Sequence, residues 1–266
     1  MVTLPSARRD EIVNILKSKD YAEISYLSQK FSVSEMTIRR DIDKLEKEGK
    51  VLKVYGGVRL KEIREKEYEG SIEERKGRNS FEKKLIALEA VKFIEDGDVI
   101  AFDASTTALE LSRHIKFKKK VTVVTNNINI AVELSSDPDI TIILLGGFLR
   151  RTSLSVFGSS ISKYLESIYI DKAFISCKSL NFNDGVTDSL IDEGEAKQAI
   201  IMRSTYLYLL ADHTKINTIA FFKICPAESV NTLITDEVVP FNKEQQKCLE
   251  QYRENGTNVI IAKQSN

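Results

Sequence analysis

The chain has 266 residues, and its 39 basic and 39 acidic side chains give a formal net charge of zero. Apolar residues make up 42% of the chain and charged residues 29%, a globular composition that argues against a disordered or collagen-like protein. No apolar run approaches the roughly 18 residues of a membrane-spanning helix, and the first ten residues lack the apolar core of a secretory signal. We therefore expect a cytoplasmic protein with no membrane partner.

The cysteines and histidines are too few and too scattered for a metal or disulfide framework. Cys177, Cys225 and Cys248 are widely spaced and fit neither a set of disulfides nor a zinc ribbon. His114 and His213 are the two histidines of the chain, which argues against a histidine-rich metal site. We therefore expect no metal and no other cofactor. Cys177 falls in a predicted strand, where core packing is its expected role.

Charge is distributed unevenly along the chain. Residues 1–60 hold 12 Lys or Arg and 9 Asp or Glu, so this part is basic and the remainder is acidic. Residues 61–78 hold twelve charged side chains, six of each sign, which is typical of a solvated connector. The sequence therefore predicts a basic N-terminal module, a charged linker over 61–78, and a mildly acidic body.

The first 60 residues have the pattern of helices followed by a hairpin. Apolar residues recur at helical spacing, Ser34 is the expected N-cap of the third helix, and Gly56-Gly57 marks a turn between strands. Two helices joined by a short turn and followed by a hairpin form a winged helix-turn-helix. The predicted elements are helices after Pro5 and over 24–31 and 35–49, and strands over 51–55 and 58–60.

From Ser80 onward, helices alternate with short β-branched runs. This alternation predicts an α/β domain with a mostly parallel sheet and helices on both faces, whose ligands bind beyond the carboxyl ends of the strands. Helices are expected over 80–95, from 107, and over 128–135, 159–167, 192–204 and 242–254. Strands are expected over 98–103, 121–125, 140–145, 169–177, 206–211, 219–224, 230–235 and 258–262.

The third helix has one apolar and one polar face. Ile38, Ile42 and Leu45 fall in one sector at helical spacing and must face the core. The polar face carries arginines in its N-terminal half, as a helix that enters the major groove of DNA requires. An ordinary solvated helix face would have a similar composition, so both interpretations stay open on composition alone. The polar face and its flanks comprise Met36, Thr37, Arg39, Arg40, Asp43, Lys44 and Lys47.

Polar or glycine-rich turns follow three consecutive predicted strands. Residues 103–107 (Asp-Ala-Ser-Thr-Thr) open a helix, where backbone N–H groups and hydroxyls can hold a phosphate. Serine or threonine at such a position is more often only an N-cap. Thr125-Asn126 and Gly146-Gly147 follow the next two strands, so the three turns are expected to line one crevice.

The N-terminal motifs resemble a known DNA-binding domain. The run from Phe31 to Ile42 reads Phe-Ser-Val-Ser-Glu-Met-Thr-Ile-Arg-Arg-Asp-Ile and is followed by a Tyr-Gly-Gly wing. It is similar to the helix-turn-helix domain of the DeoR family of bacterial transcription regulators, whose pattern is Val-Ser-x-x-Thr-Ile-Arg-Arg-Asp-Leu with a later Gly-Gly pair. The resemblance implies contacts with double-stranded operator DNA and a bracing role for Asp41. The DNA-binding residues that we expect are Ser34, Met36, Thr37, Arg39, Arg40, Lys44, Lys47 and Tyr55.

The body, over about 80–240, resembles the effector domain of the same family. That domain is marked by Asp-x-Gly-Thr-Thr, Thr-Asn, Gly-Gly and Asp-x-Ser-Lys, is related to sugar-phosphate isomerases, and binds phosphorylated sugars. The resemblance therefore implies a phosphorylated sugar as effector, with Lys215 of Asp-His-Thr-Lys as a cation for its phosphate. The ligand-binding residues that we expect are Asp103, Ser105, Thr106, Thr107, Thr125, Asn126, Gly146, Gly147, Arg150, Asp171, Asp188, Glu193, Lys197 and Lys215.

The acidic run near residue 190 has two interpretations. Acidic residues favour the first turn of a helix, and Glu193 and Lys197 are i, i+4 partners, so the run can be structural. The resemblance instead assigns Asp188, Glu193 and Lys197 to ligand contact.

The chain also departs from the family pattern. Ser105 replaces a usual glycine, and Ser176 and Ser179 lie in a stretch that usually contains glycines. These serines bear on whether the pocket still binds a sugar phosphate.

The resemblance implies a DNA-binding transcription regulator that represses a sugar catabolism operon as a homo-oligomer. Its DNA-binding domain would be 1–60 and its effector-binding domain 79–266, and it would not be an enzyme. One alternative is a sugar-phosphate isomerase with Asp171 or Glu193 as the base. Another is a constitutive DNA-binding protein whose pocket has degenerated.

Overall fold

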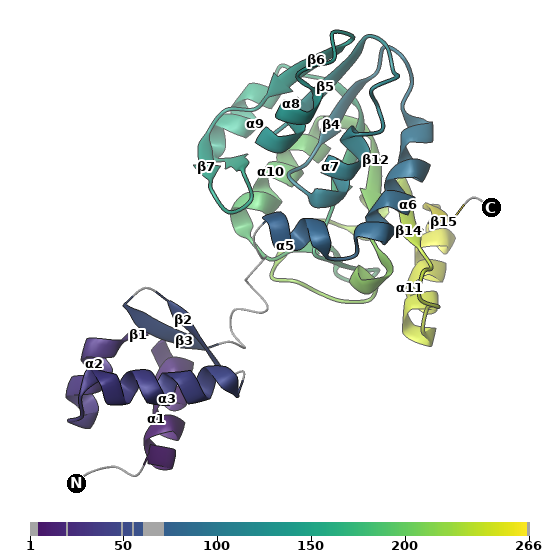
Figure 1. Ribbon diagram of the computed structural model, residues 1–266. Coiled ribbons are helices and arrows are strands. Elements are labelled where there is room, and N and C mark those ends of the chain that lie inside the picture. The colour runs from purple at the N-terminus through teal and green to yellow at the C-terminus, as the bar shows by residue number, and fades with distance from the viewer. Residues whose placement is uncertain (1–4, 20, 49, 55, 61–71, 265–266) are drawn as a thin grey trace. The chain divides into compact units, whose positions relative to one another are not determined.

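The computed structural model describes residues 5–19, 21–48, 50–54, 56–60 and 72–264 (Figure 1). The chain divides into two compact units, Met1–Glu69 and Gly70–Asn266, and each is described by itself. Part of the predicted linker 61–78 is the helix α5 (Ile72–Gly77), which belongs to the second unit. Residues 61–71 lie outside the described residues.

The first unit is a winged helix-turn-helix, as predicted. Its elements are α1 (Pro5–Lys19), β1 (Tyr21–Glu23), α2 (Ile24–Phe31), α3 (Glu35–Lys47), β2 (Val51–Val54) and β3 (Gly57–Leu60). The strands form an antiparallel sheet in the order β1-β3-β2. Apolar side chains from all three helices and the hairpin share one core, among them Ile12, Leu27, Ile38, Leu45 and Val58.

Local residue chemistry sets the turn between α2 and α3. Ser32 ends α2 in the left-handed region, with φ of 51°. Ser34 is the N-cap of α3, and its Oγ accepts a hydrogen bond of 3.3 Å from the backbone N–H of Thr37. The predicted N-cap is confirmed, whereas α3 ends at Lys47, two residues before the predicted end.

The strand β1 was not predicted, and Gly57 explains how it fits. A Cβ atom at Gly57 would lie 2.4 Å from Cε2 of Tyr21 and 2.6 Å from the carbonyl oxygen of Ala22. Only glycine therefore lets β1 approach β3 closely enough to pair with it. Three residues of strand are too short to produce an alternating pattern in the sequence.

The second unit alternates helices and strands. Its further helices are α6 (Ser80–Ala90), α7 (Thr106–Ser112), α8 (Ile128–Leu134), α9 (Ser159–Leu165), α10 (Ile191–Met202) and α11 (Lys243–Glu254), with 3-10 turns η1 (Val91–Phe93), η2 (His213–Lys215) and η3 (Ala227–Ser229). Its strands are β4 (Val99–Phe102), β5 (Val121–Thr125), β6 (Ile140–Leu144), β7 (Phe148–Arg150), β8 (Ser155–Phe157), β9 (Ile170–Ser176), β10 (Ser179–Asn181), β11 (Gly185–Asp188), β12 (Ser204–Leu210), β13 (Phe222–Cys225), β14 (Thr232–Asp236) and β15 (Asn258–Ala262).

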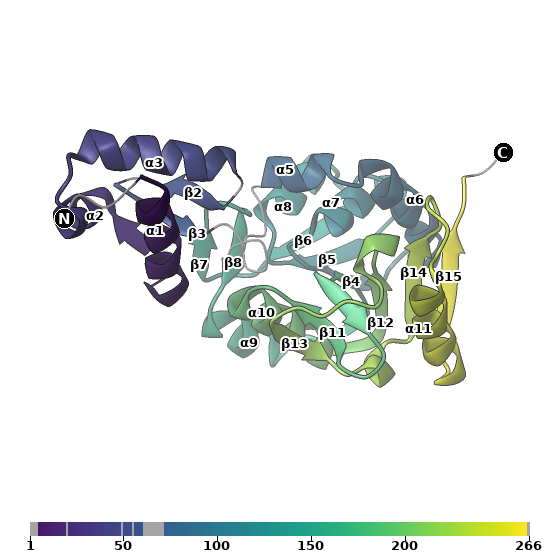
Figure 2. The same cartoon turned by 90° about the horizontal axis from the view of Figure 1, so that it is seen from below.

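Seven parallel strands form the central sheet, in the order β15-β14-β12-β9-β4-β5-β6. Successive side chains of a strand point to opposite faces, so Ile100 and Phe102 join one core and Ala101 the other. Helices α6, α7 and α8 cover one face of the sheet and α9, α10 and α11 the other (Figure 2). Side chains of the first three helices pack in the core of Ile100 and Phe102, and those of the last three in the core of Ala101. The predicted parallel α/β fold with helices on both faces is confirmed.

Two smaller antiparallel sheets were not predicted. One is the hairpin β7-β8, and the other has the order β10-β11-β13. The strand expected over 219–224 is β13, which pairs with β11 and lies outside the parallel sheet. Strands of three or four residues carry too little alternation to reveal their partners. Among the described helices, none combines the length and the apolar character needed to cross a membrane.

Candidate functional site

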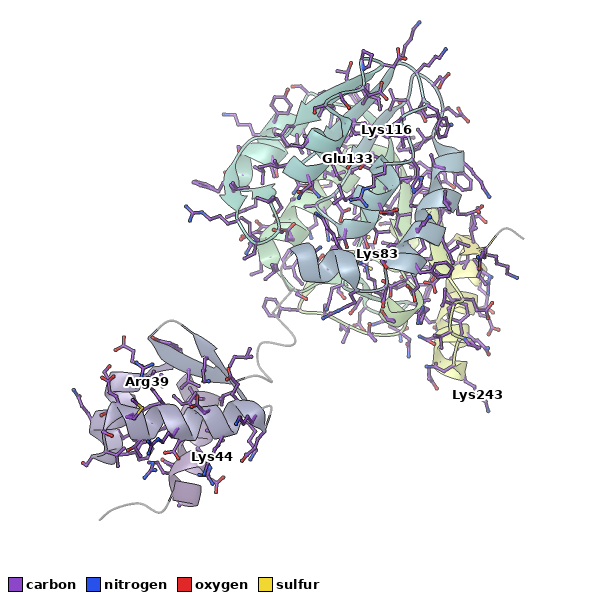
Figure 3. The ribbon with its side chains drawn as sticks, viewed as in Figure 1. Arg39, Lys44, Lys83, Lys116, Glu133 and Lys243 are labelled. Carbon is purple, nitrogen blue, oxygen red and sulfur yellow. The ribbon has the colours of Figure 1, made fainter. Side chains whose placement is uncertain are left out.

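The polar face of α3 is exposed, whereas its apolar face is buried. Ile38, Ile42 and Leu45 are at most 2% exposed, and Asp41 is buried beside them. Met36 is 61% exposed although it is apolar, which leaves its thioether free to contact another molecule. Figure 3 labels two of the basic side chains on this helix. The predicted residues with exposed positions are Ser34, Met36, Arg39, Arg40, Lys44 and Lys47.

The cations of α3 differ in whether they are neutralised within the protein. Arg39 lies 3.8 Å from Glu35, one turn earlier. In the part of the first unit that the structure describes, the side chains of Arg40, Lys44 and Lys47 make no ion pair and no hydrogen bond. These three charges are therefore available to an external anion such as a DNA phosphate.

The carboxylates on the same helix are occupied by the wing. Nζ of Lys53, on β2, lies 2.6 Å from Asp43 and 2.7 Å from Glu46. The wing thus neutralises negative charge that would repel DNA. Thr37 is partly exposed, and its hydroxyl lies 3.0 Å from that of Ser34. Tyr55 lies outside the described residues.

At the carboxyl end of β4, the predicted motif is buried. Asp103 is fully buried, and its Oδ1 accepts a hydrogen bond of 2.6 Å from the hydroxyl of Ser105. The same Oγ accepts a hydrogen bond of 3.0 Å from the N–H of Ala108 and so caps α7. Thr106 and Thr107 follow at 7% and 1% exposure. Ser105, where the family pattern has glycine, therefore acts as the helix cap.

Lys197 joins this motif to the end of β11. It comes from α10, is 5% exposed, and makes a close ion pair with Asp188. Its Nζ also lies 3.3 Å from Oδ2 of Asp103, an ion pair without hydrogen-bond geometry. One buried cation thus lies between two buried carboxylates, and Asp103 meets two residues that lie far from it in the sequence.

Several buried polar atoms near these strand ends have no hydrogen-bond partner in the described part of the chain. They are Oδ2 of Asp103, which receives no hydrogen bond, Oδ1 of Asn126 and the hydroxyl of Ser189, which follows Asp188. The other amide atom of Asn126 is used, since Nδ2 donates to the carbonyl of Val156 at 2.9 Å. Thr125 Oγ1 accepts a hydrogen bond of 3.0 Å from the N–H of Asn127. A buried polar atom without a hydrogen-bond partner destabilises the folded protein unless a ligand supplies the missing partner.

The hairpin β7-β8 contacts the first turn of α10. Glu193 is 4% exposed and accepts hydrogen bonds from Ser155 at 2.5 Å and Ser153 at 3.3 Å. Arg150 donates from Nη2 to Asp192 at 2.6 Å, and its Nε lies 3.6 Å from Glu193. Asp192 and Glu193 of the acidic run therefore contact the hairpin and its loop. Gly146 and Gly147 connect β6 to this hairpin, and Gly147 requires glycine because a Cβ would lie 2.3 Å from the carbonyl of Phe157.

Lys215 lies at the carboxyl end of β12 and reaches β9. Its Nζ donates to the hydroxyl of Ser176 at 2.9 Å and lies 3.7 Å from Oδ2 of Asp212, and its side chain is 18% exposed. Burial alone would raise the pKa of Asp212, but Lys215 and the hydrogen bonds from Thr214 and Asn79 lower it below the ordinary value. The carboxylate is therefore ionised beside a lysine that remains partly open to solvent.

The sequence missed two residues at this edge, Asn79 and Lys83. Asn79 donates to Asp212, and Lys83 is 7% exposed with its charge close to Lys215. A signal was present, because Lys83 shares the inward face of α6 with Ile86, Ala87 and Ala90 at helical spacing. Cys177 is buried in the core, as expected, and burial raises the pKa of its thiol to about 12.

Asp171 does not belong to this site, which corrects the prediction. It lies at the amino end of β9, where its carboxylate accepts a hydrogen bond of 2.8 Å from the N–H of Val99 at the start of β4. In a parallel sheet, all amino ends lie at the edge opposite the carboxyl ends. Asp171 is therefore removed from the phosphate-binding residues and from the candidate bases.

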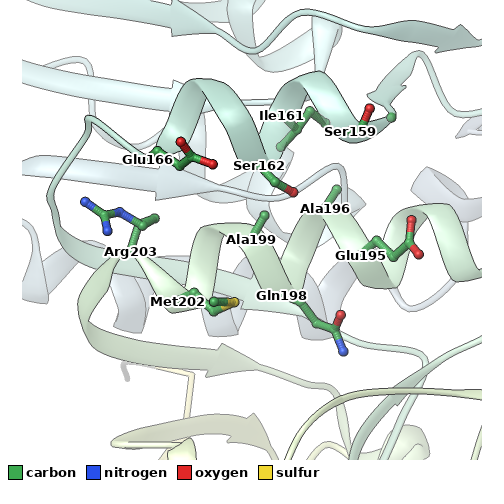
Figure 4. A pocket seen from close by; sticks show the side chains of 11 residues that line it. Ser159, Ile161, Ser162, Glu166, Glu195, Ala196, Gln198, Ala199, Met202 and Arg203 are labelled. Atoms are coloured by element: carbon green, nitrogen blue, oxygen red, sulfur yellow. The ribbon is translucent and has the colours of Figure 1, made fainter.

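A separate groove of about 520 Å³ lies between α9 and α10 (Figure 4). Glu195, Ala199 and Met202 line it from α10. Glu193 and Lys197 lie on the other side of that helix, where they contact β8 and β11. None of the predicted ligand-binding residues is among the described residues that line this groove.

Two family models match the chain. One is described as the DeoR-like helix-turn-helix domain and matches residues 8–64, and the other is described as the DeoR C terminal sensor domain and matches residues 78–237. Together they include both clusters of predicted residues.

Similar proteins are named as transcriptional regulators. An uncharacterized HTH-type transcriptional regulator of Bacillus subtilis, YulB, is 39% identical over 233 residues, which cover 88% of this chain and 89% of that protein. The HTH-type transcriptional regulator GolR of Listeria innocua is 33% identical over 258 residues, covering 97% of this chain and 99% of that protein. The HTH-type transcriptional repressor GlcR of Bacillus subtilis is 32% identical over 229 residues, covering 85% and 86%.

A solved structure of D-ribose-5-phosphate isomerase in complex with phospho-erythronic acid is a distant match. It has a TM-score of 0.38 and 18% identity, and the match covers 50% of this chain and 52% of that one. So distant a likeness bears on no activity of this chain. The two family models and the relatives decide the matter: the chain belongs to the DeoR family of helix-turn-helix transcriptional regulators.

Proposed function

We propose that this chain represses a sugar catabolism operon by binding double-stranded operator DNA through α3, and that a phosphorylated sugar controls this binding. Residues 1–60 would bind DNA and 79–266 the effector, with α5 of the segment 61–78 belonging to the effector unit. The protein would act in the cytoplasm as a homo-oligomer, because symmetric operators pair two recognition helices.

The exposed cations of α3 carry the DNA-binding part of the proposal. Arg40, Lys44 and Lys47 have no anionic partner in the described part of the first unit, while Lys53 neutralises the carboxylates of Asp43 and Glu46. An arginine near the helix N-terminus can reach guanine edges, and lysines further along can reach phosphates.

A salt titration tests this part. Lys47→Ala should weaken binding to all DNA sequences alike and reduce the slope of log affinity against log salt by roughly one. The matched control is Lys243→Ala, which removes an exposed lysine from α11 in the other unit (Figure 3). If the salt dependence of DNA affinity has the same slope in both variants, Lys47 does not contact DNA.

The unpartnered polar atoms at the carboxyl edge of the sheet carry the effector part. Asn126 and Ser189 each offer a buried atom without a partner, and Lys215 offers a partly exposed cation. A phosphorylated sugar combines an anion with several hydroxyls, so one molecule can satisfy both kinds of group. Ser176, one of the departures from the family pattern, accepts a hydrogen bond of 2.9 Å from Lys215, so this departure contacts the cation that we propose for the phosphate.

A thermal-shift screen tests the effector. Pentose and hexose phosphates should raise the melting temperature of the full-length protein, because a ligand that binds only the native state stabilises it by mass action. The same sugars without phosphate are the control and should give a smaller shift. No shift with any phosphorylated sugar would favour a constitutive DNA-binding protein with a degenerate pocket. Turnover of a sugar phosphate by the purified protein would favour the isomerase alternative, for which Glu193 is the remaining candidate base.

A further inference from the structure

Helices α5 and α6 meet at a joint that we define as residues 75–83. Asn79 is the N-cap of α6 and adopts the left-handed conformation, with φ of 50°, which asparagine tolerates better than most residues. Its side-chain amide donates to Oδ1 of Asp212 at 3.1 Å and to Oγ1 of Thr214 at 3.2 Å. The joint is therefore fastened to η2, the turn that carries Lys215.

Lys83 fastens the same joint to the end of α5. Its Nζ donates to the carbonyl oxygen of Arg75 and, at 2.5 Å, to that of Arg78. The last carbonyls of a helix lack intrahelical donors and attract a cation. One buried ammonium thus holds the carboxyl end of α5, the first described helix after the segment 61–71 that connects the two units.

The charges of Lys83 and Lys215 are coupled through one carboxylate. The pKa of Lys83 is lowered to about 8, mainly by burial and further by the charge of Lys215, while Asp212 opposes the shift. Asp212 lies 3.7 Å from Lys215 and accepts the hydrogen bond from Asn79. A phosphate at Lys215 would offset the positive charge that lowers the pKa of Lys83 and so favour the protonated form of Lys83, which is the stronger donor to the two carbonyls.

We propose that Lys83 and Asn79 are positioning residues that transmit effector binding at Lys215 to the carboxyl end of α5. The inference rests on the proposed function, because it takes Lys215 as a ligand of the effector phosphate. It gives the regulation a physical path, since Asp212, which lies beside Lys215, also accepts the hydrogen bond from Asn79 at the joint. The anion would strengthen the hydrogen bonds that Lys83 donates at the carboxyl end of α5, the first described helix that follows the DNA-binding unit in the chain.

Hydrogen exchange of the amides in 72–83 tests the joint in the full-length protein, with inorganic phosphate as the probe. Phosphate should slow this exchange in the wild type. The slowing should be lost in Lys83→Met, which keeps the length of the side chain but cannot donate. The matched control Lys84→Met changes the next residue, which is exposed, and should behave as the wild type. Lys83→Arg keeps a charged donor and should restore part of the protection.

Calorimetry with the same probe separates the two proposals. Phosphate should bind Lys84→Met as tightly as the wild type and should still bind Lys83→Met, more weakly by the factor by which phosphate stabilises the joint, because the coupling is reciprocal. If phosphate binds the wild type but does not change hydrogen exchange in 72–83, the proposed role of the joint is wrong, while the proposed effector site stands. Loss of phosphate binding in a folded Lys83→Met would make Lys83 a direct ligand and overturn its positioning role. If neither phosphate nor any sugar phosphate binds the wild type, the proposed sensor fails and the joint fails with it.

A second variant covers the case in which Lys83→Met does not fold. Asn79→Ala removes the attachment to η2 and leaves the lysine in place. It should bind phosphate and lose the phosphate-dependent protection of 72–83. Retained protection in Asn79→Ala would overturn the role of Asn79.

Discussion

Nε of Arg8, on α1, donates a hydrogen bond of 2.6 Å to Oδ2 of Asp41, on α3, and both side chains are at most 6% exposed. Nη1 of Arg9 lies 3.6 Å from Oδ1, the other carboxylate oxygen of Asp41. The pair crosses the helical core and fixes the rotation of α3 about its axis. Because that rotation decides which side chains are exposed, Asp41 positions the DNA-binding face without belonging to it.

Removing one partner of this pair should destabilise the first unit. Asp41→Ala removes the carboxylate that accepts the hydrogen bond from the buried Arg8, which should cost about 3–5 kcal/mol in the free energy of unfolding of that unit. Hydrogen exchange of amides in α1, α2 and α3 measures this free energy in the full-length protein. The double variant Arg8→Leu with Asp41→Leu removes both charges of the buried pair and should recover most of the stability. A double variant as unstable as the single one would contradict the argument.

Arginines on the polar face of α3 should determine operator affinity. Arg40→Ala should cost roughly 1–3 kcal/mol if a bidentate base contact is lost, and Arg39→Ala should also weaken binding. The measurement is operator affinity at one fixed salt concentration, with Lys243→Ala as the control for loss of a distant charge. Unchanged affinity in both arginine variants would remove α3 as the recognition helix.

A negative charge at the start of α7 should exclude the effector. Thr106→Asp puts a carboxylate where the phosphate is expected, and an acidic residue in the first turn of a helix is compatible with folding. Sugar-phosphate binding, measured by calorimetry, should be lost while circular dichroism stays that of the wild type. Thr106→Asn has nearly the same shape without the charge and should retain most of the binding. Normal sugar-phosphate affinity in a folded Thr106→Asp protein would mean that the phosphate does not bind at the start of α7.

Lys215 should be needed for the response to the sugar and not for DNA binding itself. Lys215→Ala should bind operator as the wild type does, with no change on adding the sugar phosphate found in the screen. Lys223→Ala, an exposed lysine on β13, is the matched control and should respond normally. In the wild type, operator DNA must change sugar-phosphate affinity by the same factor by which the sugar phosphate changes operator affinity. Loss of operator binding in Lys215→Ala without any sugar would mean that the residue is structural.

The buried amine of Lys83 should make stability depend on pH in the alkaline range. Its folded pKa of about 8 lies below the unfolded value of 10.5, so between these values the unfolded chain holds more protons. Its contribution to the free energy of unfolding therefore increases as the pH rises through this window. The charged groups that act on it are Lys215, Asp212, Arg75 and Arg78. Urea unfolding from pH 7.5 to pH 10, a range set around those pKa values, should show a steeper rise for the wild type than for Lys83→Met. If the free energy of unfolding changes with pH in the same way in both proteins, the lowered pKa of Lys83 is contradicted.

The sequence by itself determined the class of the fold and the polar face of α3. Helical spacing of Ile38, Ile42 and Leu45 depends only on neighbouring turns of one helix, so the opposite face follows without knowledge of the tertiary structure. The N-cap Ser34 is local in the same sense, because its partner is the N–H of Thr37. Alternation of helices with β-branched strands was likewise enough to predict the parallel sheet.

Only the tertiary structure decided which polar residues meet at the carboxyl edge. Asn79 and Asp212 are 133 residues apart, and their hydrogen bond depends on the order of the strands in the sheet. The resemblance assigned Asp171 to the ligand-binding residues, yet the direction of β9 places it at the opposite edge of the sheet. Lys83 is a lysine on an inward face, and its partners are carbonyl groups that no side-chain pattern marks. Periodicity records which way a side chain points from its own helix or strand, whereas a site is made by elements whose positions depend on packing between segments far apart in the chain.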